Sequence, residues 1–99
     1  MEFKILIAGA CFLVNDKLVI TATPKRDEEI EEAVNRKKSF FLEKWKDKSL
    51  LVYTSGKTIK TKIVEIQVNS SLTNYKLFHF LTSLDSQHEI KAGDIIEIV

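Results

Sequence analysis

The chain has 99 residues, of which 44% are hydrophobic and 29% are charged, and its formal net charge is +1. This length supports one domain with a modest core, covering residues 1–99, and excludes two domains. The near-neutral charge favours neither a nonspecific nucleic-acid coat, which is usually far more basic, nor an acidic surface partner.

The first third of the chain is predicted to be β-structure. Residues 3–7 and 11–14 have the apolar character of strands, and Gly9 allows a bend or bulge between them. Asn15 and Asp16 tolerate the left-handed backbone of a tight hairpin turn. This turn leads into a predicted strand over residues 18–22.

The single cysteine, Cys11, lies within an apolar run. It can form no intramolecular disulfide, so we expect a reducing compartment, with the cytoplasm as the default. A rival interpretation is a bacterial lipoprotein cleavage site over residues 6–11. The preceding residues carry no net positive charge and the apolar part before the cysteine is very short, so a buried strand is favoured. The run is also too short to span a bilayer, and no membrane association is expected.

A long helix is predicted from Lys25 to about Lys48, as an insertion between strands. Thr23 suits the cap, and Pro24 suits the first helical position. Acidic residues crowd the start of this segment and lysines its end, as the helix dipole favours. Residues that recur every three or four positions predict one stripe facing the barrel: Ile30, Ala33, Val34, Lys37, Phe41 and Trp45.

The second half of the chain returns to strands. Residues 50–54 and 58–63 are joined by a glycine-containing hairpin connection over residues 55–57. The apolar alternation changes phase at Ile63 and Val64, which predicts a β-bulge there, because a shift of one residue would otherwise turn core side chains outward.

A polar turn over residues 69–71 leads to a strand over 75–81 that is apolar on nearly both faces and is therefore expected to be central. Residues 85–89 are predicted as a loop. A Gly-Asp turn then leads into a closing strand over 94–99. The predicted fold is mainly β with one inserted α-helix, in a small closed or partly open antiparallel β-barrel.

The second half also resembles domain II of the translational GTPases, the elongation-factor-type β-barrel. The residues that carry the resemblance are 55–58 leading into 62–66, and the Ile-Lys-x-Gly-Asp-x-Ile-x-Ile ending over 90–98. The likeness covers residues 50–99 and, more weakly, 3–22. It implies a barrel that docks other domains or the acceptor end of tRNA. The chain contains no phosphate-binding Gly-x-x-x-x-Gly-Lys-Ser/Thr loop, and the charged helix departs from the family pattern, so no catalytic residue is carried over.

No catalytic constellation or cofactor site is predicted. His79 alternates with phenylalanines on a strand and is expected to be a packed histidine, since it has no nucleophile as an obvious partner. His88, with Asp85 and Glu89, offers too few ligands for a structural metal site. Cys11 lacks the nearby cation that makes a reactive thiolate. We therefore expect neither an enzyme nor a small-molecule substrate.

The second half of the predicted helix is the candidate functional region. Its aromatic residues Phe40 and Trp45 are the candidate partner-binding residues, and Phe40 lies off the apolar stripe, where it could anchor a partner. In a plainer interpretation, the helix lays Phe41 and Trp45 onto the barrel and exposes its lysines to water. The cations that could hold phosphates beside these aromatics are Arg36, Lys37, Lys38, Lys44 and Lys46.

Two functions from different classes follow from this region. The leading hypothesis is a non-catalytic interaction module that binds a protein partner, or a second copy of itself, through the helical insertion and the adjacent surface. The alternative is an RNA-associated, translation-type module that binds tRNA or single-stranded RNA through the basic half of the helix. An enzyme that uses one of the two histidines is the remaining possibility.

Overall fold

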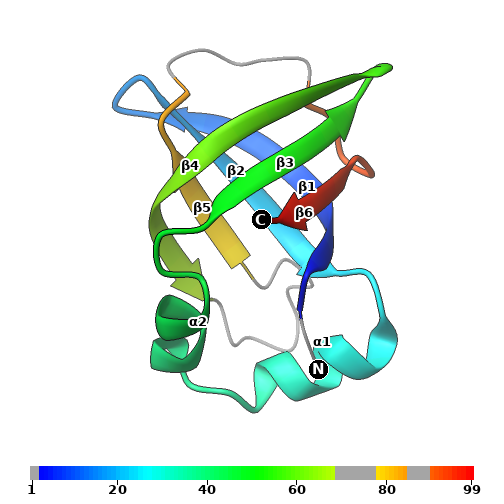
Figure 1. Ribbon diagram of the computed structural model, residues 1–99, viewed down its shortest axis with the longest axis vertical. Coiled ribbons are helices and arrows are strands. Elements are labelled where there is room, and N and C mark those ends of the chain that lie inside the picture. The colour runs from blue at the N-terminus through cyan, green and yellow to red at the C-terminus, as the bar shows by residue number, and fades with distance from the viewer. Residues whose placement is uncertain (1–2, 69–77, 85–89) are drawn as a thin grey trace.

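The computed structural model describes residues 3–68, 78–84 and 90–99. Within them, antiparallel strands form a closed barrel in the order β1-β2-β5-β4-β3-β6 (Figure 1). Two helices, α1 (Asp27–Val34) and α2 (Lys38–Lys44), lie between β2 and β3. The strands are β1 (Ile5–Val14), β2 (Lys17–Pro24), β3 (Ser49–Thr54), β4 (Lys57–Val68), β5 (Phe78–Thr82) and β6 (Ile95–Ile98). The prediction of a mainly β fold with a small antiparallel barrel is confirmed, and of the two alternatives, closed or partly open, the barrel is closed.

Both predicted hairpin turns are present. Asn15 and Asp16 connect β1 to β2 with φ of 50° and 64°. Ser55 and Gly56 connect β3 to β4 with φ of 46° and 77°. Two consecutive positive φ angles are the mark of a primed turn, whose twist matches that of the paired strands.

Two register shifts bend the long strands. The pairing of β1 with β2 shifts between Ala8 and Cys11, and the pairing of β4 with β5 shifts between Ile63 and Glu65. The bulges predicted near Gly9 and near Ile63 and Val64 are therefore confirmed. Each bulge changes which residues of its strand face the core, so both halves of β4 can bury isoleucines.

The closing and central strands also follow the prediction. β5 pairs with both β2 and β4, and β6 closes the barrel by pairing with β1 and β3. The predictions for residues 69–71, 75–77 and 85–89 fall outside the described residues.

The prediction of a single long helix over residues 25–48 is wrong, because α1 and α2 are separate helices. Lys37 between them has extended backbone, with φ of −75° and ψ of 152°. A continuous helix of that span would be about 36 Å long, which exceeds the longest dimension of the molecule, 33 Å. Breaking the helix lets α2 turn back so that Phe41 reaches the barrel.

The predicted cap by Thr23 is also wrong. β2 continues through Pro24, which pairs with Leu6, and the N-cap of α1 is Arg26, with no side-chain hydrogen bond. A proline at the last position of a strand is tolerated because the ladder there loses only one donor.

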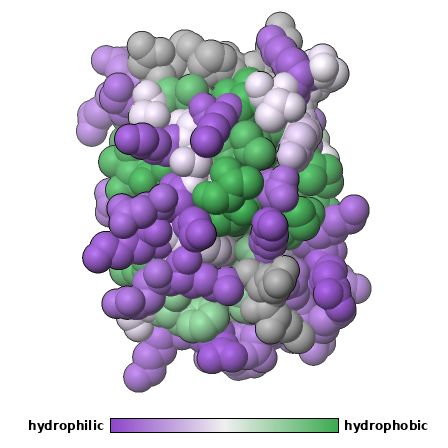
Figure 2. Space-filling view, in the orientation of Figure 1, coloured by the Kyte–Doolittle hydropathy of each residue, from purple (hydrophilic) through white to green (hydrophobic). Residues whose placement is uncertain are grey.

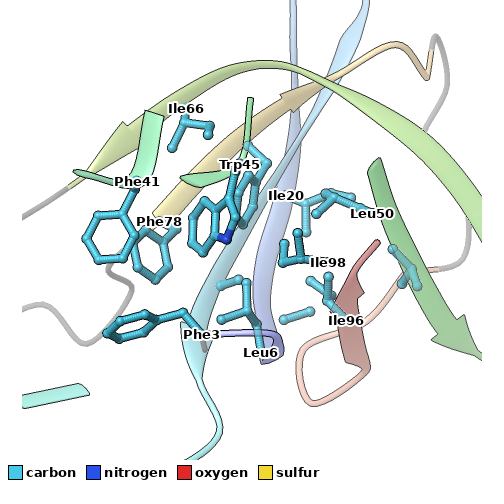
Figure 3. Close-up of a cluster of buried hydrophobic side chains, with 14 of the residues drawn as sticks. Phe3, Leu6, Ile20, Phe41, Trp45, Leu50, Ile66, Phe78, Ile96 and Ile98 are labelled. Carbon is cyan, nitrogen blue, oxygen red and sulfur yellow. The ribbon is translucent and has the colours of Figure 1, made fainter. Parts of the chain in front are cut away.

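The helices cover one end of the barrel (Figure 1), where Phe41 and Trp45 enter the core with exposed fractions of 0% and 2%. The Trp45 ring lies 4.9 Å from that of Phe78 and 5.1 Å from that of Phe41, centroid to centroid. Figure 3 shows Trp45 among side chains of the helix end and of the barrel, including Ile66. The prediction that α2 lays both aromatics onto the barrel is confirmed.

Among the described residues, neither helix has the length and apolar character needed to cross a membrane.

Candidate functional site

Of the two histidines considered for chemistry, the structure describes His79. His79 is half-buried on β5, with its ring 6.3 Å from that of Phe12. His88 lies outside the described residues. Within 3–68, 78–84 and 90–99, no three His, Cys, Asp or Glu side chains are grouped so as to hold a metal ion.

Cys11 is half-buried and packs against the core. Burial raises the pKa of its thiol, the nearby Asp94 carboxylate raises it further, and a hydrogen bond involving Thr21 opposes them. A raised pKa leaves less thiolate at neutral pH, and the thiolate is the nucleophilic form. This environment does not activate the thiol.

The two aromatics predicted to bind a partner have different positions. Trp45 is in the core, so a partner docked on the folded protein does not reach most of its ring. Phe40 is half-buried, with its ring centroid 6.0 Å from that of Phe3 and 5.0 Å from that of Phe41. The Arg36 guanidinium lies over the Phe40 ring, 4.6 Å from its centroid. Phe40 therefore carries a cation on its ring rather than standing free as an anchor.

Two hollows lie beside the predicted region. A hollow of about 760 Å³ lies at the junction of α1 and α2, and a second one of about 330 Å³ lies between α2 and the end of β6. Both are lined by Lys44, so we treat them together as the cationic trough. The first is lined by Asn35, Arg36, Lys37, Ser39, Phe40, Glu43 and Lys44, and the second by Lys4, Lys44, Trp45, Lys48, Ile98 and Val99.

The trough gathers only part of the predicted basic set. Arg36, Lys37 and Lys44 line the trough. Lys46 lines a different hollow, and Lys38 lines neither the trough nor that hollow. Lys4 and Lys48 also line the trough, which the sequence analysis did not anticipate. Lys4 could not have been found by inspecting the helix, since it precedes β1 and is brought there by the barrel.

A second surface, absent from the sequence analysis, lies on the outer side of the barrel. One hollow of about 150 Å³ and another of about 250 Å³ share Glu65 in their lining, and we refer to them together as the apolar belt. The first is lined by Phe12, Val14, Val19, Glu65, Gln67, His79 and Leu81, and the second by Leu42, Trp45, Lys46, Asp47, Ile63, Val64, Glu65 and Ile66.

The strand register explains how the belt forms. Phe12 pairs with Val19, Val19 with Leu81, and Leu81 with Glu65, which makes one row across four strands. The bulge in β4 leaves Val64 60% exposed, and Leu42 on α2 is 42% exposed. Phe12 and Val14 are 41% and 42% exposed. Four large hydrophobic side chains thus reach water in the linings of two hollows that share Glu65.

Part of this surface had a signal in the sequence. The phase change at Ile63 and Val64 implies that one of the two residues leaves the core. For Phe12 and Val14 the signal was misleading, because an apolar run of this kind is typical of a buried strand.

In comparisons with known proteins, no family model, no curated protein and no solved structure matches this chain. The resemblance to domain II of the translational GTPases therefore stays a prediction.

Proposed function

We propose that the protein is a non-catalytic interaction module that binds another protein chain along the apolar belt. This surface lies between α2 and β4 and continues over the outer side of β4, β5, β2 and β1. The observation that supports this most is the exposure of two pairs of large hydrophobic side chains, each at least 41% exposed: Phe12 and Val14 line one hollow, Leu42 and Val64 line the other, and Glu65 lines both. Apolar side chains gathered on a surface and rimmed by polar groups are typical of protein interaction sites.

The dimensions of the belt indicate what the partner presents. A hollow of about 150 Å³ floored by Val19 and Leu81 matches the size of a cavity that holds one benzene-sized group. Its polar lining by Glu65, Gln67 and His79 can hydrogen-bond the partner backbone. We therefore expect a segment that inserts one large aliphatic or aromatic side chain here and covers Val64 with another, each contributing about 1.5–3 kcal/mol if fully buried.

The test is a comparison of three forms of the full chain as bait in an extract of its own cells. Leu42→Asp combined with Val64→Asp places two charges on the belt, whereas Thr58→Asp places one on an exposed position of the distant β3–β4 hairpin. We expect wild type and Thr58→Asp to retain the same protein, and the double variant to lose it. Equal retention by all three, or retention of no protein by wild type, contradicts the proposal.

Sedimentation of the purified forms identifies the occupant. We expect wild type to be monomeric, because the partner is a different protein. A wild-type dimer that the double variant dissociates would show that the belt is covered by a second copy, and would overturn the proposal of a different partner.

The second candidate is the RNA-associated, translation-type module that the domain II resemblance implies. The convergence of Arg36, Lys37 and Lys44 on one trough favours it, and the burial of Trp45 counts against it, because a buried ring offers no face on which a base can stack. Its test is binding of tRNA or single-stranded RNA that weakens as salt rises and falls on Lys37→Glu with Lys38→Glu. No binding at low salt would dispose of it.

A further inference from the structure

We propose that the cationic trough is a separate binding site for an acidic, extended protein segment that carries an apolar residue among its carboxylates. This goes beyond the apolar belt, since Trp45 is the one lining residue that the trough and the belt share. Figure 2 shows that hydrophilic side chains cover most of the visible surface at the end of the molecule that carries the helices.

The charges of the trough are unbalanced although the chain as a whole is nearly neutral. Among the described residues, five cationic side chains line it, against one acidic side chain, that of Glu43. In a chain of net charge +1, this is a local excess of positive charge. Such an excess attracts anionic partners and raises the rate at which they associate.

Three of these cations form no ion pair with any other residue that the structure describes. Arg36 donates through Nε to Glu32 at 2.7 Å, and Lys4 lies 3.9 Å from Glu97. Within the part of the chain that the structure describes, the remaining lysines of the trough, Lys37, Lys44 and Lys48, make no ion pair. Among the described residues, no ion pair has to break before these three lysines meet an incoming carboxylate.

The floor of the trough favours a peptide over a nucleic acid. Single-stranded nucleic acids bind strongly where bases stack on open aromatic faces. Here Arg36 covers one face of Phe40, and Trp45 is 2% exposed. Ile98 is only 6% exposed. The accessible part of the half-buried Phe40 remains as apolar lining, which suits an aliphatic side chain lying between two acidic ones.

Glu43 provides the sharpest test, because within the described part of the chain it is the acidic side chain that lines the trough. Its carboxylate repels an acidic ligand, so Glu43→Gln is expected to tighten binding two- to threefold, a change that damage to the fold would not produce. Lys37→Glu combined with Lys44→Glu is expected to weaken binding about tenfold. The double variant loses two pairs between an exposed lysine and a ligand carboxylate, and each such pair contributes modestly. Lys60→Glu, on an exposed position of β4 away from the trough, is the control that reverses one lysine charge, half the change of the double variant, and it is expected to have little effect.

The probe is a fluorescein-labelled peptide of repeated Glu-Glu-Leu units, followed by fluorescence anisotropy with the full chain. A Gln-Gln-Leu peptide and labelled oligouridylate serve as the comparison ligands, and circular dichroism confirms that each variant is folded. We expect binding of the acidic peptide that weakens with added salt and follows the order Glu43→Gln, wild type, then the double variant.

Three results would overturn the proposal: equal binding of the acidic and neutral peptides, an unchanged affinity in the double variant, or oligouridylate that binds more tightly and displaces the peptide. Val64→Asp, on the belt and on β4 rather than α2, is expected to leave peptide binding intact. Failure of the trough and failure of the apolar belt are therefore told apart by whether the trough substitutions or the belt substitution has an effect.

Discussion

The Glu29 carboxylate accepts a hydrogen bond from the backbone N–H of Phe3 through Oε2, at 2.8 Å. Glu29 is only 5% exposed although it is charged. The bond joins the segment before β1 to the first turn of α1. It also holds Phe3 where its ring packs against Phe41, with the centroids 5.3 Å apart.

Replacing Glu29 with alanine is expected to cost about 2 kcal/mol of unfolding free energy, because it removes a charge-assisted bond and leaves a buried N–H without its partner. Glu29→Gln keeps an acceptor and is expected to cost less. Urea denaturation measures both changes, with Glu31→Ala on the exposed side of α1 as the control. Equal stability of Glu29→Ala and Glu31→Ala would show that the bond contributes nothing.

Phe41→Ala is expected to cost about 3–5 kcal/mol, since it empties a large space in the core. It also removes the ring beside Trp45, the single tryptophan of the chain. We expect tryptophan emission to shift to longer wavelength and its quenching by acrylamide to increase. Phe12→Ala, at a 41% exposed position, is the matched control and is expected to change the emission little. An unchanged spectrum in Phe41→Ala would mean that α2 does not seal this end of the barrel.

Cys11 is expected to react with a disulfide reagent more slowly than free cysteine at neutral pH. Burial and Asp94 raise the pKa of its thiol, so the reactive thiolate is scarcer and access is restricted. Because this is the single cysteine in the chain, the rate belongs to one site. Unfolding in urea is expected to restore the rate of a free thiol, and a native rate as fast as the unfolded one would contradict the assigned environment.

Tyr53 is expected to titrate above its ordinary range. Its hydroxyl donates to Glu97 Oε1 at 2.7 Å, and this bond is the main reason that its pKa is raised. A pKa raised by folding means that this bond stabilises the protein below the ordinary pKa of tyrosine, and that the contribution is lost as pH rises through the folded value. Ultraviolet titration of wild type and Glu97→Ala measures the shift, which we expect the substitution to reduce. Tyr53→Phe isolates the signal of the other tyrosine, Tyr75, and identical curves for wild type and Glu97→Ala would refute the assignment.

Much of the barrel could be predicted because its signals are local. Positive φ at Asn15 and Gly56 follows from residues that tolerate it. The bulge at Ile63 follows from the change in apolar phase. The strand order could not be read from such signals, since it depends on which strands meet after the chain has turned several times.

Only part of the helical region could be predicted, and the reason is physical. The spacing of Ile30, Phe41 and Trp45 correctly identifies an inward-facing stripe. The same spacing continues through Lys37, where the backbone is in fact extended. Periodicity does not reveal a break when the residues on both sides remain in phase. The break follows instead from the size of the molecule, which is too small for one continuous helix over residues 25–48.

The candidate surfaces were the least predictable part. The trough depends on Lys4 and Lys44, which are far apart in the sequence. The belt depends on Phe12, Val64 and Leu42, which look like core residues along the chain and become exposed only through strand register and the turn of α2.

The most direct test of the central claim, that the apolar belt is a protein-binding surface, is site-specific photo-crosslinking. A benzophenone-bearing residue is placed at position 64 on the belt or at position 58 on the β3–β4 hairpin, and each protein is irradiated in an extract of its own cells. We predict a covalent adduct with one other protein from position 64, none from position 58, and loss of the adduct when Leu42→Asp is added. No adduct from position 64, or equal adducts from both positions, would contradict the claim.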